Sequence, residues 1–258
     1  PEVSVITSIS MDHMEFLGHT IEEIASHKAG IIKKAIPVVT MEQEQAVSDI
    51  LREEAKQKMS PFYDVSEDNL KFEEKAAKYI DFLNANAYDK ERDVRTNIAG
   101  EFQKSNLAAA LQTAELICGR LDEDKIYEAL SQIRISGRME EIAPGIIVDV
   151  SHNIQGMQGF VQTVEANYHG MKKRILFAAS HQNEEEYMKN ILKTIPEIEA
   201  FYTVGIHKRR IDEAEFQDAF RKMIDRNQET TVCFVVGSFY LAGMAKEFIN
   251  QEEENVRL

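Results

Sequence analysis

Apolar and polar residues alternate along the chain in two different periods. Short apolar runs rich in β-branched residues, typical of buried parallel strands, occur at residues 3–9, 36–40, 146–150, 174–179, 200–205 and 231–237. Apolar residues at helical spacing occupy 20–30, 43–58, 102–118 and 123–133, and further helical patterns start near 156, 184, 212 and 238. Between 62 and 98 the pattern weakens into short strand-like pieces. The alternation of strands and helices predicts an α/β protein.

The segment SGRMEEIAPG, residues 136–145, interrupts this alternation with two glycines, a proline and mixed charge. We interpret it as the linker region between two domains, at 1–135 and 136–258. The second domain is predicted to be a small, mostly parallel open sheet with helices on its faces, a Rossmann-like arrangement. In such sheets ligands bind at the carboxyl ends of the strands.

Composition excludes several classes of partner. The formal net charge of −14 argues against general binding to nucleic acid or to an anionic membrane, because both require a cationic surface. No apolar run approaches the roughly 20 residues of a membrane-spanning helix, and the start lacks the basic lead of a secretory signal. Cys118 and Cys233 lie far apart without metal-type spacing, and we expect both to be buried thiols in a reducing cytoplasm. A soluble, cytoplasmic protein is predicted.

The helix predicted at 20–30 has clear end signals and one residue of chemical interest. Thr20 suits the N-cap, the acidic Glu22 and Glu23 suit the first turn, and Gly30 is expected to end the helix. Lys28 lies two turns after the first residues of this helix, and therefore on the same side of the helix as its start. Lys28 is either a cation that favours the helix C-terminus or a functional group.

The first strand ends close to a second candidate. Asp12 and His13 follow it, so they lie at the edge where open α/β sheets bind ligands, although His13 also fits a polar loop residue. His19 and His27 have no metal-ligand spacing with His13 and are expected at the surface.

Later candidates also allow two interpretations. Gln103 and Asn106 can read an adenine edge or a ribose, but polar residues in a first turn commonly cap it. Arg138 can reach a phosphate with its planar guanidinium or form a salt bridge in the linker. Asp149 and His152 follow a strand end, where a carboxylate and an imidazole suit contact with ribose or phosphate.

Five segments together resemble the folylpolyglutamate synthase and dihydrofolate synthase family, the folate branch of the Mur ligase superfamily. ITSISMDHMEFLGHTIEEIASHKAGIIK is similar to the family signature ITSIxxDHxxxLGxTIxxIAxxKAGIIK. GEFQKSNLAAAL resembles its GxxQxxN helix, SGRMEEI its PGRxE linker, DVSHNIQG its DGAHNP segment and GSFYLAG its GSxYLxG motif. The motifs occur in family order and extend over nearly the whole chain.

The resemblance implies a fold, a reaction and roles for residues. It implies the remainder of a P-loop-type ATPase domain followed by a smaller Rossmann-like domain, and an ATP-dependent ligase that joins L-glutamate to a folate or pteroate through an acyl phosphate. By the same resemblance His13 binds Mg²⁺ and Lys28 is a carbamylated residue facing the metal site. The resemblance also implies that five residues contact the nucleotide: Gln103, Asn106, Arg138, Asp149 and His152. Lys28 and His152 are the catalytic positions, and a monomer is expected.

The chain departs from the family pattern in several places. No GxxxxGK[ST] phosphate loop occurs in these 258 residues, and the family's glutamate metal ligand upstream of the DH motif is absent. Pro1 aligns inside the family's first domain, so the chain is expected to be the C-terminal part, truncated at its N-terminus and inactive alone. HQNEEEY at 181–187 replaces a DKD segment, and Ile154 replaces a proline. A non-catalytic homologue acting as a binding module and another Mur-type amide ligase are the alternatives.

Overall fold

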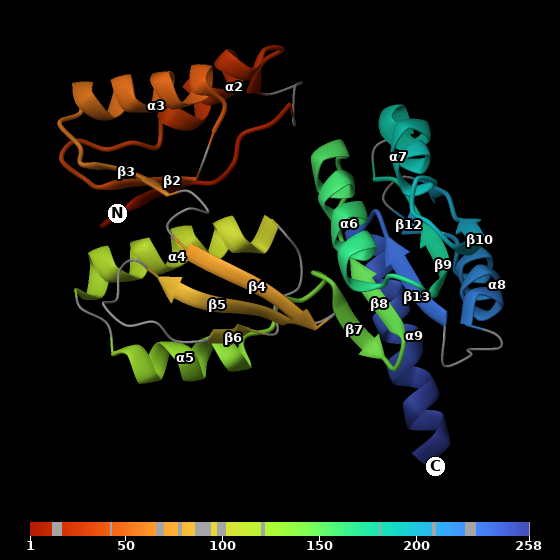
Figure 1. Cartoon of the computed structure of the whole chain (residues 1–258). Coiled ribbons are helices and arrows are strands. Elements are labelled where there is room, and N and C mark those ends of the chain that lie inside the picture. Colours follow the sequence, from red (N-terminus) through yellow and green to blue (C-terminus); the bar gives the residue numbers. More distant parts are fainter. Residues whose placement is uncertain are drawn as a thin grey trace. The chain divides into compact units, whose positions relative to one another are not determined.

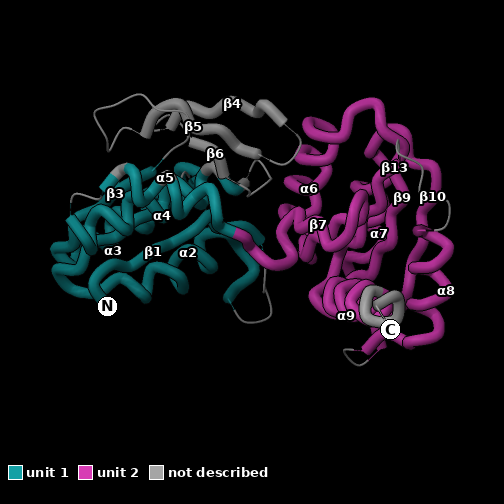
Figure 2. Tube along the Cα trace, turned by 90° about the horizontal axis from the view of Figure 1, so that it is seen from below, with its two compact units in different colours: residues 1–75, 79–97, 101–133 teal, residues 76–78, 98–100, 134–258 magenta. Residues whose placement is uncertain are grey.

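The chain forms two units in the computed structural model (Figure 2). The structure describes residues 1–11, 17–41, 43–65, 70–76, 79–85, 94–96, 102–119, 122–180, 182–207, 210–224 and 231–257. Unit 1 comprises most of residues 1–133, and unit 2 comprises residues 134–258 together with 76–78 and 98–100.

Unit 1 contains a parallel sheet in the order β1-β2-β3. Its elements are β1 (Ser4–Ile6), β2 (Val38–Met41), β3 (Phe62–Val65), α2 (Ile21–Ala29), α3 (Gln45–Gln57) and α4 (Phe102–Cys118). One hydrophobic cluster joins the sheet to α2 and α3, and another joins the opposite side to α4, so helices lie on both faces (Figure 1). This is the layered arrangement that the alternating pattern predicts.

The ends of α2 follow from its sequence. The Thr20 side chain accepts a hydrogen bond from the backbone N–H of Glu23 at 3.2 Å, which satisfies one of the donors left open at a helix start. Gly30 is the C-cap, as predicted, but it has a right-handed conformation with φ −59°. The chain therefore turns after α2 without the left-handed glycine that ends many helices.

A second, smaller sheet in unit 1 has the order β4-β5-β6. Its strands are β4 (Leu70–Ala76), β5 (Tyr79–Ala85) and β6 (Val94–Thr96), with β5 and β6 antiparallel. Helix α5 (Glu123–Gln132) lies next to β6 (Figure 1). These strands correspond to the weak strand-like pieces of the sequence between 62 and 98.

Unit 2 is built on a five-stranded sheet in the order β10-β9-β13-β8-β7. The strands are β7 (Glu140–Ala143), β8 (Ile146–Asp149), β9 (Lys172–Phe177), β10 (Ile198–Thr203) and β13 (Thr231–Val236), and only β7 is antiparallel to its neighbour. The helices are α6 (Ile154–Asn167), α7 (Glu185–Leu192), α8 (Glu213–Ile224) and α9 (Phe239–Arg257). A 3-10 turn, η2 (Gln182–Glu184), precedes α7, and the short strands β11 (Ile206–His207) and β12 (Arg210–Ile211) precede α8.

Alternate residues of the central strands face two separate cores. Ile147, Phe177 and Phe234 pack with the inner sides of α6 and α7. Val148 and Leu176, on the opposite face, pack with α8 and α9. This period of two explains why the strands are apolar throughout, since each is covered on both sides. The predicted open, mostly parallel sheet is confirmed.

Two expectations about local environment were wrong. Cys118 is exposed at the end of α4, whereas only Cys233 is buried. Residues 140–143, inside the segment interpreted as a linker, form β7 at the edge of the unit 2 sheet. Backbone pairing with β8 overrides the turn-forming composition there, because an edge strand requires hydrogen bonds on one side only.

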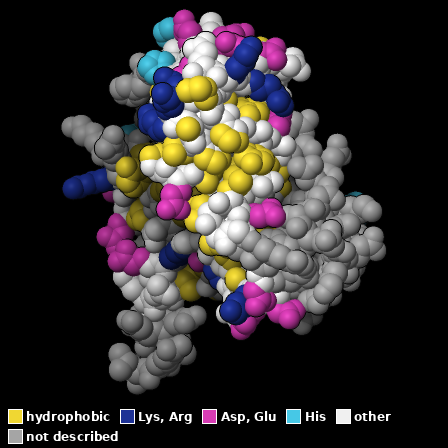
Figure 3. Space-filling view, turned by 90° about the vertical axis from the view of Figure 1, so that its left-hand side faces the viewer, with side chains coloured by type: hydrophobic (Ala, Val, Ile, Leu, Met, Phe, Trp, Pro, Cys, Tyr) yellow, Lys and Arg dark blue, Asp and Glu magenta, His cyan; other side chains and the backbone are white. Residues whose placement is uncertain are grey.

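Unit 1 also exposes large hydrophobic side chains. They are Val5, Met11, Ile31, Met59 and Ile117, each at least 38% exposed. Figure 3 shows an area of hydrophobic side chains on one face of the molecule, bordered by charged ones. No helix among the described residues is long and apolar enough to span a lipid bilayer.

Candidate functional site

The strands of unit 2 end together at one edge of the sheet. Register pairs Val236 at the end of β13 with Asp149 of β8 on one side and Phe177 of β9 on the other. The chain leaves β8 toward α6 and leaves β13 toward α9, and these helices cover opposite faces. Neighbouring strands whose connections diverge in this way leave a crevice that accepts ligands.

His152 lies at this edge of the sheet, with its ring fixed on two sides. Its Nδ1 is 2.9 Å from the carbonyl oxygen of Val150, and its ring centroid is 5.5 Å from that of Phe239, with the planes at 48°. A carbonyl oxygen can only accept, so Nδ1 carries the proton and donates it. In the neutral ring Nε2 then has a free lone pair, which suits a hydroxyl or ammonium donor on a ligand.

The N-terminus of α6 opens at the same edge. Asn153 is the N-cap, and its Oδ1 accepts a hydrogen bond from the backbone N–H of Gly156 at 2.8 Å. The start of a helix carries unpaired N–H groups and a partial positive charge, which favour an anion. An imidazole and a helix start therefore lie side by side along the chain at residues 152–154.

Asp149 is fully buried beneath this loop. Its Oδ1 accepts from the backbone N–H of Ser151 at 2.8 Å and from the Ser151 hydroxyl at 2.6 Å, and its Oδ2 accepts from the N–H of Met139 at 3.0 Å. Burial raises the pKa of Asp149, while the hydrogen bonds from Ser151 and Met139 and the charge of Arg138 oppose that rise. Its carboxylate is thus engaged with the protein itself.

Arg138 lies in the turn that Asp149 contacts. The residue is half-buried, and its charge acts on the Asp149 carboxyl. The structure thus brings Arg138, Asp149 and His152 into one region of unit 2, although they come from two segments of the chain. Their predicted contacts with ribose and phosphate stay predictions.

Unit 1 holds the other predicted positions. The Asn106 amide donates to Gln103 Oε1 at 3.0 Å, and the Gln103 side chain is buried in the first turn of α4. Lys28 is half-buried in the last turn of α2, and its ammonium has no hydrogen-bond or ion-pair partner among the described residues. His19 and His27 are exposed, as predicted.

A magnesium site is not assembled by the described side chains. No group of three His, Cys, Asp or Glu residues in the described ranges could hold a metal ion, and His13 lies outside the described residues. An ammonium such as that of Lys28 is not a metal ligand, whereas the carbamate that the family resemblance implies would offer oxygens, the donors that Mg²⁺ prefers.

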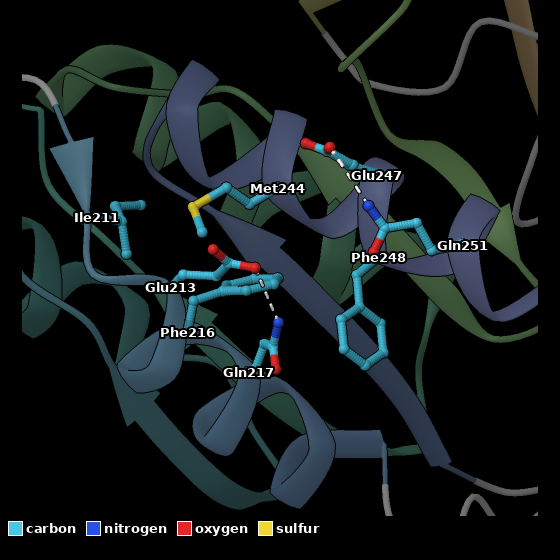
Figure 4. Close-up of a pocket in the computed structure, with 8 residues that line it drawn as sticks. All are labelled: Ile211, Glu213, Phe216, Gln217, Met244, Glu247, Phe248 and Gln251. Carbon is cyan, nitrogen blue, oxygen red and sulfur yellow. Dashed lines mark hydrogen bonds between the residues drawn. The ribbon is translucent and has the colours of Figure 1, made fainter.

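A pocket of about 230 Å³ lies elsewhere in unit 2, between α8 and α9 (Figure 4). Phe216, Met244 and Phe248 provide apolar surface, and Glu213 and Glu247 accept hydrogen bonds from glutamine side chains one helical turn further on. None of the residues predicted from the sequence lines it. The pocket and the carboxyl edge of the sheet are therefore separate features.

Sequence reasoning missed four residues that shape the region around Arg138 and His152. They are Ser151, Phe239, Glu140 and Lys246. Ser151 and Phe239 lie inside segments already singled out, so their position next to strand ends was an available signal. Lys246 contacts Ser136, 110 positions earlier in the chain, and no sequence pattern indicates that contact.

Comparison with known proteins gives a consistent result. Residues 1–114 match the family model of the Mur ligase middle domain. The chain is 30% identical over 202 residues to dihydrofolate synthase/folylpolyglutamate synthase of Bacillus subtilis, covering 76% of this chain and 47% of that protein. The chain therefore spans about half the length of this curated relative.

Solved structures show the same fold. The apo form of L. casei FPGS matches with a TM-score of 0.79 at 23% identity, over 96% of this chain and 61% of the other. An FPGS-AMPPCP-folate complex matches with a TM-score of 0.78 at 24% identity, over 96% and 62%. The two-unit α/β architecture of this chain is thus shared with those proteins.

Proposed function

This chain belongs to the Mur ligase family, on the branch of the folylpolyglutamate and dihydrofolate synthases, and we propose that the protein acts as an ATP-dependent ligase for L-glutamate. The acceptor is a folate or a dihydropteroate. The name of the Bacillus subtilis relative supports both acceptors, and the solved complex with AMPPCP and folate supports a nucleotide and a folate as ligands. Mg²⁺ would accompany ATP, as is usual in phosphoryl transfer.

The proposed reaction has two steps. A carboxylate oxygen of the acceptor attacks the γ-phosphorus of ATP, which forms an acyl phosphate and releases ADP. The neutral amine of L-glutamate then attacks the acyl carbon, so that an amide bond forms, phosphate leaves and the amine loses a proton. Both steps involve anionic groups whose charge must be stabilised by positioned donors and cations.

The residues of unit 2 suit this chemistry. Arg138 offers a guanidinium that binds phosphate oxygens bidentately. The start of α6 offers backbone N–H groups to an anion, and Nε2 of His152, in the neutral ring with the proton on Nδ1, offers an acceptor to a ribose hydroxyl or to the amine that loses its proton. We assign these groups to the nucleotide and to the reacting centre.

The residues of unit 1 complete the proposal. Gln103 and Asn106 would contact the nucleotide, with their mutual hydrogen bond fixing the Asn106 amide. Lys28 is half-buried and has no partner among the described residues, which suits carbamylation, because a neutral amine adds CO₂ to give a carbamate anion and a proton. His13 is proposed as a magnesium ligand.

The observation that carries the proposal is the convergence of Arg138, His152 and the α6 N-terminus at the carboxyl edge of the unit 2 sheet, in a chain homologous to the named ligases. The test is ATP-dependent incorporation of labelled L-glutamate into dihydropteroate and into a folyl-glutamate. Because this chain contains no phosphate-loop motif and spans about half of its relative, the assay uses the product of the complete natural gene.

The expected result is ligation with at least one acceptor and its near loss in Lys28→Ala and His152→Ala. His169→Ala, in the turn after α6, serves as a control with full activity expected. Absence of ligation with both acceptors and with muramyl-type acceptors would point to a binding protein. Full activity in Lys28→Ala would refute the role of Lys28.

A further inference from the structure

We infer that Lys246, Glu140 and Asp149 clamp the turn that carries Arg138 and so position its guanidinium at the site. None of these three is required to touch a ligand for this role, so we regard them as positioning residues. Only the identity of what Arg138 binds rests on the proposed function. The clamp itself is a statement about contacts within unit 2.

The first half of the clamp holds the residue before Arg138. The Glu140 carboxylate accepts a hydrogen bond from the backbone N–H of Gly137 and also forms an ion pair with the Lys246 ammonium of α9. The same ammonium contacts the hydroxyl of Ser136. Burial acts to raise the pKa of Glu140, but the hydrogen bonds from Lys246 and Gly137 outweigh it and lower the pKa below its usual value. Glu140 is therefore held as an anion.

The backbone of Gly137 is also fixed by Val150, the residue that follows β8. Its carbonyl oxygen accepts a hydrogen bond from the N–H of Val150 at 2.8 Å, and its φ is +74°. A Cβ at this position would lie 2.8 Å from Cγ1 of Val150, so only glycine fits. The turn thus lies tightly against the end of β8, next to Asp149.

The second half of the clamp holds the residue after Arg138. The N–H of Met139 donates to the buried Asp149 carboxylate, and the Met139 side chain is 7% exposed in the core beneath α6. Because Asp149 also bonds to Ser151, one carboxylate connects the turn of Arg138 with the loop of His152. Asp149 therefore fixes the segments of Arg138 and His152, both predicted to contact a ligand, relative to each other.

This arrangement has a functional consequence. Fixing the backbone on both sides of Arg138 removes conformational freedom that ligand binding would otherwise have to remove, so the point from which its side chain extends is set in advance. The Lys246 side chain is 27% exposed and that of Glu140 30%, so water screens the pair only in part. Losing Lys246 should loosen the turn while the core of unit 2 remains intact.

The first test is hydrogen exchange of backbone amides in this chain. In Lys246→Met the Gly137 amide should exchange about tenfold faster, as expected when one charge-assisted contact is lost, with β9 amides unchanged. Lys246→Arg should restore most of the protection. The matched control is Lys222→Met on α8, which removes an exposed ion pair with Asp218 and should leave Gly137 unaffected. Unchanged exchange at Gly137 in Lys246→Met would overturn the clamp.

The second test separates the clamp from the function of Arg138. In the complete ligase, Lys246→Met should raise KM for ATP several-fold with a smaller change in kcat, and Lys246→Arg should recover it. If Arg138→Ala leaves KM for ATP unchanged although Lys246→Met accelerates exchange at Gly137, the assignment of Arg138 to phosphate fails and the clamp stands. If Arg138→Ala raises KM but Lys246→Met alters neither exchange nor KM, the clamp fails and the proposed function stands.

Discussion

The two glycines of the segment GSFYLAG should respond to alanine with opposite signs. Gly237, between β13 and α9, has φ +109°, and a Cβ there would lie 2.6 Å from the carbonyl oxygen of Ala178 and 2.6 Å from the Phe177 ring. Gly243 lies within α9, and a Cβ there would meet nothing within 4 Å. The same substitution thus meets a strained, crowded site in one case and an open helical site in the other.

The expected magnitudes follow from these environments. Gly237→Ala incurs about 1–2 kcal/mol for the backbone conformation and roughly 1–3 kcal/mol for displacing neighbours, so unit 2 should lose about 2–5 kcal/mol. Gly243→Ala should gain about 0.5–1 kcal/mol, because alanine loses less conformational entropy in a helix. Gly170→Ala, with φ +74° and no neighbour within 4 Å, isolates the backbone part at about 1–2 kcal/mol.

The assay is the rate of thiol labelling at Cys233 in a Cys118→Ser background. Cys233 is buried in β13, and burial raises its pKa to about 11, so it reacts only when unit 2 opens. Labelling should accelerate roughly 30- to 4000-fold in Gly237→Ala and slow about 2- to 5-fold in Gly243→Ala. Wild-type labelling rates in Gly237→Ala would refute the geometry of the strand end.

Three further outcomes are expected. In the native wild-type chain the exposed Cys118 should react with a thiol reagent at once, while Cys233 remains protected until denaturant is added. The folded-state pKa of Glu140 is lowered, so its ionised form stabilises the fold above the usual pKa of 4.5, and this stabilisation is lost as pH falls through the folded value. The free energy of unfolding should therefore fall more steeply with decreasing pH in wild type than in Lys246→Met. Thr20→Ala should destabilise α2 by about 1 kcal/mol, measured by urea denaturation, and Thr20→Ser should retain most of that stability.

The sequence predicted local structure well where one residue pattern decides it. The helix predicted at 102–118 is α4, from Phe102 to Cys118, and Thr20 caps α2. The apolar runs became the parallel strands of both units, because a strand covered on both faces must be apolar throughout. The position of His152 after a strand end was also predicted, because the strand before it and the helix after it are both recognisable from local sequence.

The exposure and the contacts of individual residues were predicted less well, because they depend on which other segments pack against those residues. Cys118 has apolar neighbours in sequence but points outward at the end of α4. Residues 140–143 have the composition of a turn but pair with β8. Asp149 is fully buried and accepts hydrogen bonds from Met139 and Ser151, contacts that the sequence did not indicate, while its contact with a nucleotide stays a prediction.

The sequence by itself determined the α/β class, the order of the elements and the family resemblance, because these depend on short-range periodicity and on motifs read in order. Only the tertiary structure decided that Lys246 reaches Glu140, that Asp149 joins the turn of Arg138 to the loop of His152, and that Phe239 packs on the His152 ring. These contacts join segments that are distant along the chain. They exist because the crossovers between parallel strands return those segments to one edge of the sheet, which no local pattern encodes.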